Sequence, residues 1–190
     1  MFNPFSLITH NARVVCAALL AALLTASCSS VAPDAYRAEK PVLELDQYFN
    51  GTLDAWGMFQ DRSGQVIKRF TVVMRCIWVG DTGTFDEDFT YSDGSKERRV
   101  WTIKKLSGGR YTGTAADVPG EAQGVASGNA LNWKYVLKLP VDGKVVEVNF
   151  DDWMYLMDDR VMLNRAAMSK FGFRLGEVTL SFTKRNRSHR

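Results

Sequence analysis

The sequence predicts an all-β protein, built as a single antiparallel up-and-down barrel of about eight to ten strands. From Tyr48 onward, short segments alternate between apolar and polar residues, and clusters rich in Gly, Asp, Ser and Pro separate them. These turn signals lie at residues 61–64, 92–94, 107–109, 119–120, 127–129, 140–143, 158–159 and 171–172. Short strands at regular turn spacing are typical of a β-sandwich or a barrel, and we expect the barrel.

The expected strands each show one apolar face. The apolar positions are Phe49, Leu53, Ala55 and Phe59 in the first strand, Val66, Phe70, Val72, Met74, Cys76 and Trp78 in the second, Leu131, Trp133, Tyr135, Leu137 and Leu139 in a later one, and Val178, Leu180 and Phe182 in the last. Because side chains alternate across a strand, this pattern indicates an antiparallel sheet with one buried face.

Two segments allow more than one interpretation. Residues 161–170 fit either a strand or a short helix, and we expect a strand. Residues 111–128 are rich in Gly, Ala and Thr, which indicates a loose edge or, if these small residues face inward, room for a cavity.

The segment Ser92-Asp93-Gly94 predicts a three-residue hairpin loop, with glycine in the left-handed region. That loop places Glu87 opposite Arg99, with Phe85 opposite Trp101 on one side of them. We therefore expect a Glu87–Arg99 ion pair flanked by aromatic rings, which would fix the register of the two strands.

Asp152 is in phase with the apolar positions of its strand, whereas its neighbour Asp151 points the other way. A lone buried carboxylate is costly, so we expect a bulge or an ion partner such as Arg165 or Arg69. The candidate buried polar or ligand-contact residues are Glu87, Arg99, Trp101, Asp152, Asn164 and Arg165. The run 86–88 lacks the glycine and spacing of a calcium loop, and no metal site is expected.

The N-terminal part predicts a lipoprotein leader. The apolar run from Val14 to Leu24 is 11 residues long, too short for a spanning helix, which needs about 20. Small residues precede Cys28, so residues 1–27 are expected to be a signal peptide and Cys28 the lipidated N-terminus. Ordinary cleavage to a soluble periplasmic product is the alternative. We expect a tether over residues 28–45, the barrel over 46–184 and a basic tail over 185–190.

Composition excludes several kinds of activity. The net charge is +3, with 24 Lys and Arg against 21 Asp and Glu, and does not favour nucleic-acid binding. Beyond Cys28 the only cysteine is Cys76, and beyond the leader the only histidine is His189. Histidine-based or cysteine-based catalysis and His-ligated zinc therefore lack their central residue, so we expect no catalytic residues, no cofactor and no enzymatic activity.

A set of short motifs carries a resemblance to a known family. The motifs are Phe49-x-Gly51, Arg69-Phe70, Asp86-Glu87-x-Phe89-x-Tyr91-x-Asp93-Gly94, Arg99-x-Trp101, Gly128-Asn129-Ala130, Asp151-Asp152-Trp153, Asn164-Arg165 and Lys170-Phe171-Gly172. Together they resemble an uncharacterised family of Gram-negative lipoproteins, domain of unknown function 3833. The resemblance implies a periplasm-facing lipoprotein and brings no established activity. The strand pattern is also similar to lipocalin-like barrels, without their first-strand Gly-x-Trp, since Gly51 and Trp56 are five apart.

These observations lead to two functional hypotheses. The first is an outer-membrane lipoprotein, facing the periplasm, that binds a small apolar or lipid-like ligand inside the barrel. The second is a structural or interaction lipoprotein of the envelope with a filled interior. The membrane is the expected partner through Cys28, and the sequence identifies no protein partner.

Overall fold

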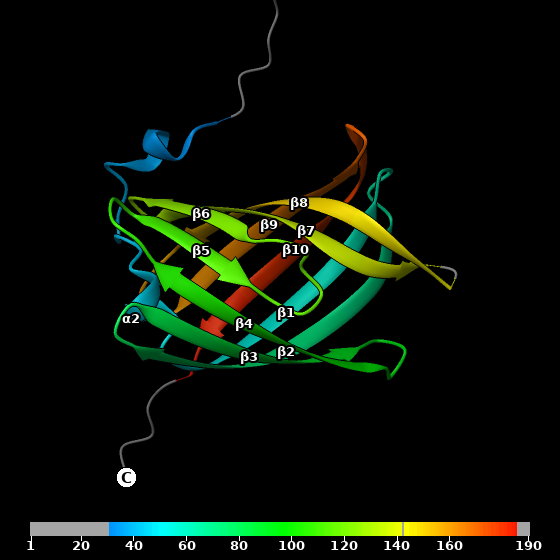
Figure 1. Ribbon diagram of the computed structural model, residues 1–190, viewed down its shortest axis with the longest axis horizontal. Coiled ribbons are helices and arrows are strands. Elements are labelled where there is room, and N and C mark those ends of the chain that lie inside the picture. The colour runs from blue at the N-terminus through cyan, green and yellow to red at the C-terminus, as the bar shows by residue number, and fades with distance from the viewer. Residues whose placement is uncertain (1–30, 142, 186–190) are drawn as a thin grey trace, which may run out of the picture. The chain divides into compact units, whose positions relative to one another are not determined.

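The computed structural model describes residues 31–141 and 143–185, which include ten β-strands in one closed antiparallel barrel (Figure 1). The strands are β1 (Gly51–Asp61), β2 (Val66–Val79), β3 (Thr82–Tyr91), β4 (Lys96–Lys105), β5 (Arg110–Thr114), β6 (Ala122–Ser127), β7 (Ala130–Val141), β8 (Lys144–Leu156), β9 (Val161–Lys170) and β10 (Phe173–Lys184). Two short helices precede them, η1 (Pro33–Tyr36) and α2 (Leu45–Tyr48). The prediction of an all-β up-and-down barrel is confirmed.

Each strand pairs with the next along the chain, and β10 pairs with β1 to close the ring. Because the ring is closed, no strand is an edge strand with a full row of unpaired backbone groups. The closed ring also rules out the β-sandwich. Within residues 31–141 and 143–185, no helix is long and apolar enough to cross a membrane.

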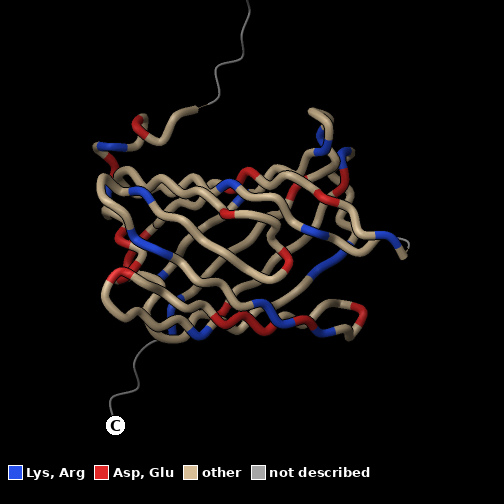
Figure 2. The backbone as a smooth tube through the Cα atoms, viewed as in Figure 1, with Lys and Arg blue, Asp and Glu red and all other residues tan. Residues whose placement is uncertain are grey.

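The expected alternation of faces holds along the strands. In β2, Phe70 and Val72 are buried while the intervening Thr71 and the preceding Arg69 are exposed. Residues 161–170 form strand β9, whose buried residues alternate with exposed ones, so the strand interpretation is confirmed and the helical one is wrong. The outer face of β3 and β4 carries neighbouring acidic and basic residues, as Figure 2 shows for this part of the barrel.

Residues 111–128 are neither a loose edge nor the wall of an enlarged cavity. They contribute β5 and β6 to the closed ring, and their glycines make room for Trp133. A Cβ on Gly113 would lie 2.7 Å from the Trp133 ring, and one on Gly124 would lie 2.4 Å from it. The small residues in this segment therefore allow one large ring to pack inside the barrel.

One end of the barrel is closed by α2 and the residues next to it (Figure 1). Leu43 and Leu45 are buried, although sequence analysis places both in the tether. The Leu43 N–H donates a hydrogen bond to the Gly128 carbonyl oxygen at 2.8 Å, and the Tyr48 hydroxyl donates to the Arg160 carbonyl oxygen at 3.0 Å. The packed part of the chain therefore begins before residue 46, the boundary expected from the sequence.

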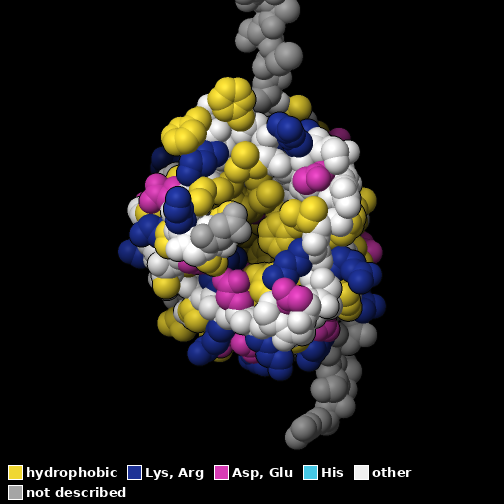
Figure 3. Space-filling model, turned by 90° about the vertical axis from the view of Figure 1, so that its right-hand side faces the viewer, with side chains coloured by type: hydrophobic (Ala, Val, Ile, Leu, Met, Phe, Trp, Pro, Cys, Tyr) yellow, Lys and Arg dark blue, Asp and Glu magenta, His cyan; other side chains and the backbone are white. Residues whose placement is uncertain are grey.

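The opposite end of the barrel is hollowed and lined by hydrophobic side chains (Figure 3). Strand hairpins reach this end, including the β9–β10 turn, where Phe171 and Phe173 are 85% and 76% exposed. The adjacent β1–β2 hairpin adds the exposed Ile67, and the β7–β8 hairpin adds Val145. The mouth of the barrel thus has an apolar rim on neighbouring hairpins.

Candidate functional site

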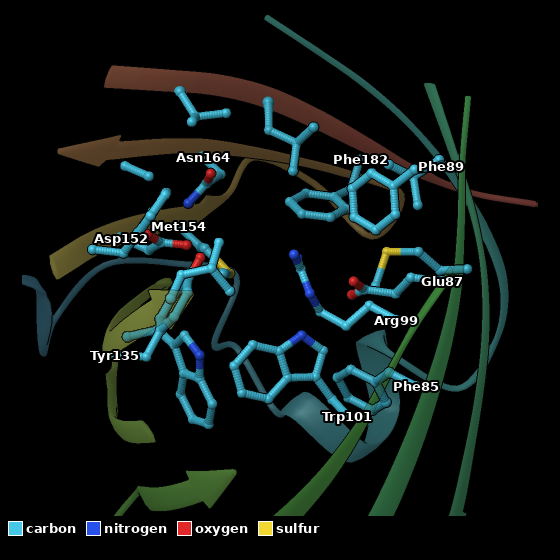
Figure 4. Close-up of a pocket in the computed structure, with 18 of the residues that line it drawn as sticks. Phe85, Glu87, Phe89, Arg99, Trp101, Tyr135, Asp152, Met154, Asn164 and Phe182 are labelled. Carbon is cyan, nitrogen blue, oxygen red and sulfur yellow. The ribbon is translucent and has the colours of Figure 1, made fainter. Parts of the chain in front are cut away.

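A cavity of about 160 Å³ lies inside the barrel and is lined mainly by aromatic and aliphatic side chains (Figure 4). Residues from most of the strands contribute to its wall. The polar side chains among them are Glu87, Glu97, Arg99, Tyr135, Asp152 and Asn164, with Tyr91 and the two indoles adding a hydroxyl and N–H groups. The cavity is therefore apolar with a small group of polar residues in its wall, as in small-molecule binding sites.

The β3–β4 hairpin has the predicted register. Glu87 pairs with Arg99 and Phe85 pairs with Trp101. The Tyr91 N–H donates to the Ser95 carbonyl oxygen at 2.9 Å, and Gly94 has φ +83°, which suits glycine. The three-residue turn therefore brings Glu87 and Arg99 to the inner face side by side.

The ion partner predicted for Arg99 needs correction. Among the described residues, the Arg99 guanidinium forms its ion pairs with Asp117 at 2.8 Å and with Glu97 at 3.5 Å. Glu87 is the cross-strand neighbour and acts on Arg99 through its charge rather than through a direct ion pair. Asp117 lies in the β5–β6 connection, outside any alternating segment, so the sequence pattern gave no sign of its role.

Glu87 is enclosed by aromatic neighbours of the cavity wall. Burial raises its pKa to about 7, although the nearby charge of Arg99 acts in the opposite direction. The negative charges of Asp117 and Glu97 add to the increase. Glu87 therefore changes its protonation state near neutral pH, well above the ordinary glutamate range.

Asp152 points inward from β8, as predicted, and is 7% exposed. Its Oδ1 atom has no hydrogen-bond partner. Burial, followed by the charge of Asp151, raises the pKa of Asp152 to about 8, while Arg99 and a hydrogen bond from Tyr135 lower it. The cavity thus contains a second carboxyl group whose hydrogen-bonding capacity is incompletely used.

The expected bulge and ion partner of Asp152 are both wrong. The register of β8 is continuous against both neighbouring strands. Arg165 faces outward and pairs with Glu177 at 2.7 Å, and Arg69 is exposed. Asp151 points away from the interior, where its carboxylate accepts a hydrogen bond from Asn132 Nδ2 at 2.6 Å.

The structure brings together five of the six candidate residues and leaves out Arg165. Asn164 is buried in the cavity wall, and its Nδ2 donates to the Trp153 carbonyl oxygen at 3.3 Å. Trp101 packs edge-on against Tyr135, with ring centroids 5.4 Å apart. Tyr135 was missed as a site residue because its position in an apolar alternation indicates only a core ring.

The buried Arg99 should stabilise the fold far more than its outward neighbour Arg98. Arg99→Ala removes the cation that faces Asp117 and Glu87, and its side chain is only 13% exposed. We expect a loss of about 3–5 kcal/mol in the free energy of unfolding. Arg98, 64% exposed and paired with Asp86, is the matched control, and Arg98→Ala should cost less than about 1 kcal/mol. Urea unfolding of both variants measures this, and equal losses would contradict it.

The two cavity carboxyls should make stability fall as pH rises. Their folded pKa values, about 7 for Glu87 and about 8 for Asp152, lie above their ordinary values, so the folded state binds more protons than the unfolded state. The contribution of these groups to the free energy of unfolding is therefore fully present below about pH 4. It is lost as the pH rises to about 8, with a slope near 1.4 kcal/mol per pH unit for each group.

We expect the free energy of unfolding to decrease between about pH 5 and pH 8. Asp152→Asn should make that decrease less steep without abolishing it, because Asn does not titrate while Glu87 still does. Surface carboxyls with a lowered pKa, such as Asp54 and Asp93, lose their stabilising contribution at lower pH. They therefore do not change the stability between about pH 5 and pH 8. Chemical unfolding at several pH values tests the prediction, which a flat profile in the wild-type protein would refute.

Within the described parts of the chain, no group of three or more His, Cys, Asp or Glu is arranged to hold a metal ion. Cys28 and the basic tail after residue 185 lie outside the described residues.

Comparison with solved structures finds chains that are similar to this one. The S-type phycobiliprotein lyase CPES from Guillardia theta is similar with a TM-score of 0.57 and 8% identity, covering 84% of this chain and 100% of that chain. A de novo designed fluorescence-activating β-barrel is similar with a TM-score of 0.42 and 13% identity, covering 75% of this chain and 99% of that chain. The lyase confirms the lipocalin-like fold and, at this identity, the fold alone.

Comparison with functionally curated proteins finds no match. A family described as a protein of unknown function, DUF3833, matches residues 22–184, which include the whole barrel and part of the segment before it. The resemblance carried by the short sequence motifs is therefore confirmed, and the chain belongs to the DUF3833 family.

Proposed function

We propose that the barrel binds a small, mainly apolar ligand in its central cavity. The observation that carries this proposal is Asp152, a carboxyl buried in the wall of an otherwise aromatic cavity with an unpartnered oxygen. An unsatisfied buried polar group costs about 1–3 kcal/mol, a cost that an apolar residue at the same position would remove. A ligand that uses this oxygen recovers the lost hydrogen bond.

The size of the cavity limits what fits inside it. A cavity of about 160 Å³ is close to the ~150 Å³ that accommodates a benzene-sized molecule, and it is below the ~300–1,000 Å³ of most ligand pockets. The enclosed part of the ligand is therefore a single ring or a short chain segment. A larger ligand would extend toward the open mouth seen in Figure 3.

The barrel of the phycobiliprotein lyase supports this proposal at the level of architecture. That protein is similar in fold over its whole length. Its likeness supports an interior suited to a small molecule, and it assigns neither a substrate nor an activity to this chain.

We also propose that the protein is lipidated at Cys28 and faces the periplasm from the outer membrane. The support is in the sequence: the short apolar run, the small residues before the cysteine, and Ser29 after it in place of the inner-membrane retention aspartate. An anchor of several acyl chains would hold the barrel permanently at the membrane.

A second candidate function, interaction through the surface, is favoured by the apolar rim. Phe171 and Phe173 are large, strongly exposed and next to Lys170, whose ammonium lies 5.2 Å from the Phe171 ring. Aromatic and cationic side chains together suit the anionic surface of a lipid bilayer. This function would not require a free cavity, so filling the cavity distinguishes the two candidates.

Ala166→Leu should block the cavity, because Ala166 is 2% exposed and lies in its wall. We expect this variant to bind benzyl alcohol at least about tenfold more weakly than wild type, a loss of about 1.4 kcal/mol. Calorimetric titration of the full-length chain in neutral-lipid nanodiscs measures it, with empty nanodiscs as the blank.

Ala167→Leu is the matched control, since Ala167 is the exposed neighbour on β9 and should leave binding unchanged. Equal binding by both variants would place the probe outside the cavity and favour the rim. An absence of binding by the wild-type protein, together with no co-purifying small molecule in native mass spectrometry, would overturn the cavity proposal.

Cys28→Ser should abolish palmitate incorporation and release the protein from the membrane fraction, because serine lacks the thiol that accepts the lipid. Cys76→Ser is the control: Cys76 is a buried thiol of the barrel, so this variant should keep both palmitate incorporation and membrane retention through Cys28. Continued labelling and membrane retention of Cys28→Ser would contradict the anchor.

A further inference from the structure

The cavity carries carboxyl groups on opposite walls. Glu87 belongs to β3 and Asp152 to β8, which are five strands apart in the ten-strand ring and therefore face each other across it. Figure 4 shows the two side chains coming from different sides of the cavity, with the guanidinium of Arg99 between them. A molecule inside the barrel consequently meets both carboxyls.

The charges around the cavity favour a cation over an anion. Arg99 is the only Lys or Arg among the described residues that line it, and this guanidinium is already paired with Asp117 and Glu97. The remaining acids, Glu87 and Asp152, have no ion pair among the residues the structure describes. A ligand carboxylate would approach two acids and one neutralised arginine, whereas a ligand with N–H donors finds two acceptors.

The aromatic lining suits the same kind of ligand. Phe89 already lies below a cation, because the guanidinium carbon of Arg99 is 5.3 Å from its ring centroid. Trp101, Phe85 and Phe182 also line this cavity (Figure 4). Aromatic rings attract ammonium groups through their negative faces, and this attraction grows when water is excluded.

We propose that the ligand is an organic amine, bound as the ammonium ion with its N–H groups donating to Asp152 Oδ1 and its charge facing Glu87. This inference rests on the proposed cavity function and specifies the chemical class of the ligand. The apolar part of the amine occupies the aromatic cavity and continues toward the mouth, which is lined by Phe59, Phe70, Leu139 and Leu180.

Proton exchange accompanies such binding. Glu87 is influenced by Arg99, Asp117, Glu97 and Asp86, and Asp152 by Asp151, Arg99, Tyr135 and Glu87. In the empty cavity, burial together with the neighbouring acids raises both pKa values, so both carboxyls are partly or largely protonated at neutral pH. An arriving ammonium ion stabilises their ionised forms, so the carboxyl protons leave to solvent as the amine binds.

The test compares three probes that share one ring and differ in the attached group: benzylamine, benzyl alcohol and benzoate. Each is titrated calorimetrically into the full-length protein in neutral-lipid nanodiscs at pH 7, with empty nanodiscs as the blank. We expect benzylamine to bind at least tenfold more tightly than benzyl alcohol, and benzoate to bind most weakly. Repeating the benzylamine titration in buffers of different ionisation enthalpy should reveal proton release.

Four variants locate the preference. Asp152→Asn and Glu87→Gln should each reduce the benzylamine preference to threefold or less, while benzyl alcohol binding stays within twofold of wild type. Outward carboxyls of the same strands provide matched controls: Asp88→Asn on β3 and Glu147→Gln on β8 should retain the full preference, because neither is among the charges that act on Glu87 or Asp152. If either inward variant fails to fold, the other variant and the proton release of the wild-type protein still decide the question.

Each outcome has a distinct meaning. Equal binding of benzylamine and benzyl alcohol, or tighter binding of benzoate, overturns the amine inference and leaves the cavity proposal standing. Failure of all three probes to bind overturns the amine inference and, when native mass spectrometry also finds no co-purifying small molecule, the cavity proposal itself.

Discussion

The closure of the antiparallel ring by the β1–β10 ladder is the constraint on which the rest of the structure depends. Nine residue pairs, from Leu53–Lys184 to Asp61–Gly176, join the first strand to the last. Once the ring is closed, every second residue of each strand must face the interior. Any polar residue at an inward position is then enclosed, whether or not a partner is available there.

The inward positions of Asp152 and Glu87 follow from this constraint. A shift of one residue in the register of β8 would bring Asp151 inside and send Asp152 to the solvent, but it would also expose Val148 and Phe150. The apolar residues of the strand therefore determine the register, and the carboxyl is carried inward with them. The free-energy cost of burying this carboxyl is offset by the many apolar contacts of the same strand.

The sequence predicts this level of organisation well because it depends on local rules. Period-two alternation identified the inward faces, and the Ser92-Asp93-Gly94 loop determined which residues of β3 and β4 oppose each other. Residues 161–170 were ambiguous because Ala166 and Ala167 suit a helix as well as a strand. Pairing with β8 and β10, which local sequence does not show, decides in favour of the strand.

Partners that come from irregular segments could not be predicted in the same way. Asp117 reaches Arg99 from a connection whose path is set by the closed ring rather than by alternation. Arg165 was expected to meet Asp152, yet it is out of phase with Asn164, which faces the cavity, and so it lies outside. Leu43 and Leu45 close one end of the barrel although their surroundings resemble a polar linker.

The separation between scaffold and site explains how a barrel fold can be shared at only 8% identity. Closure, register and the glycines beneath Trp133 define a scaffold that needs apolar volume at most inward positions. A few inward positions can be polar without opening the ring, provided that neighbouring strands retain their apolar contacts. In this chain Glu87, Arg99 and Asp152 occupy such positions. The ligand preference proposed for the interior therefore rests on these side chains rather than on the backbone that holds them.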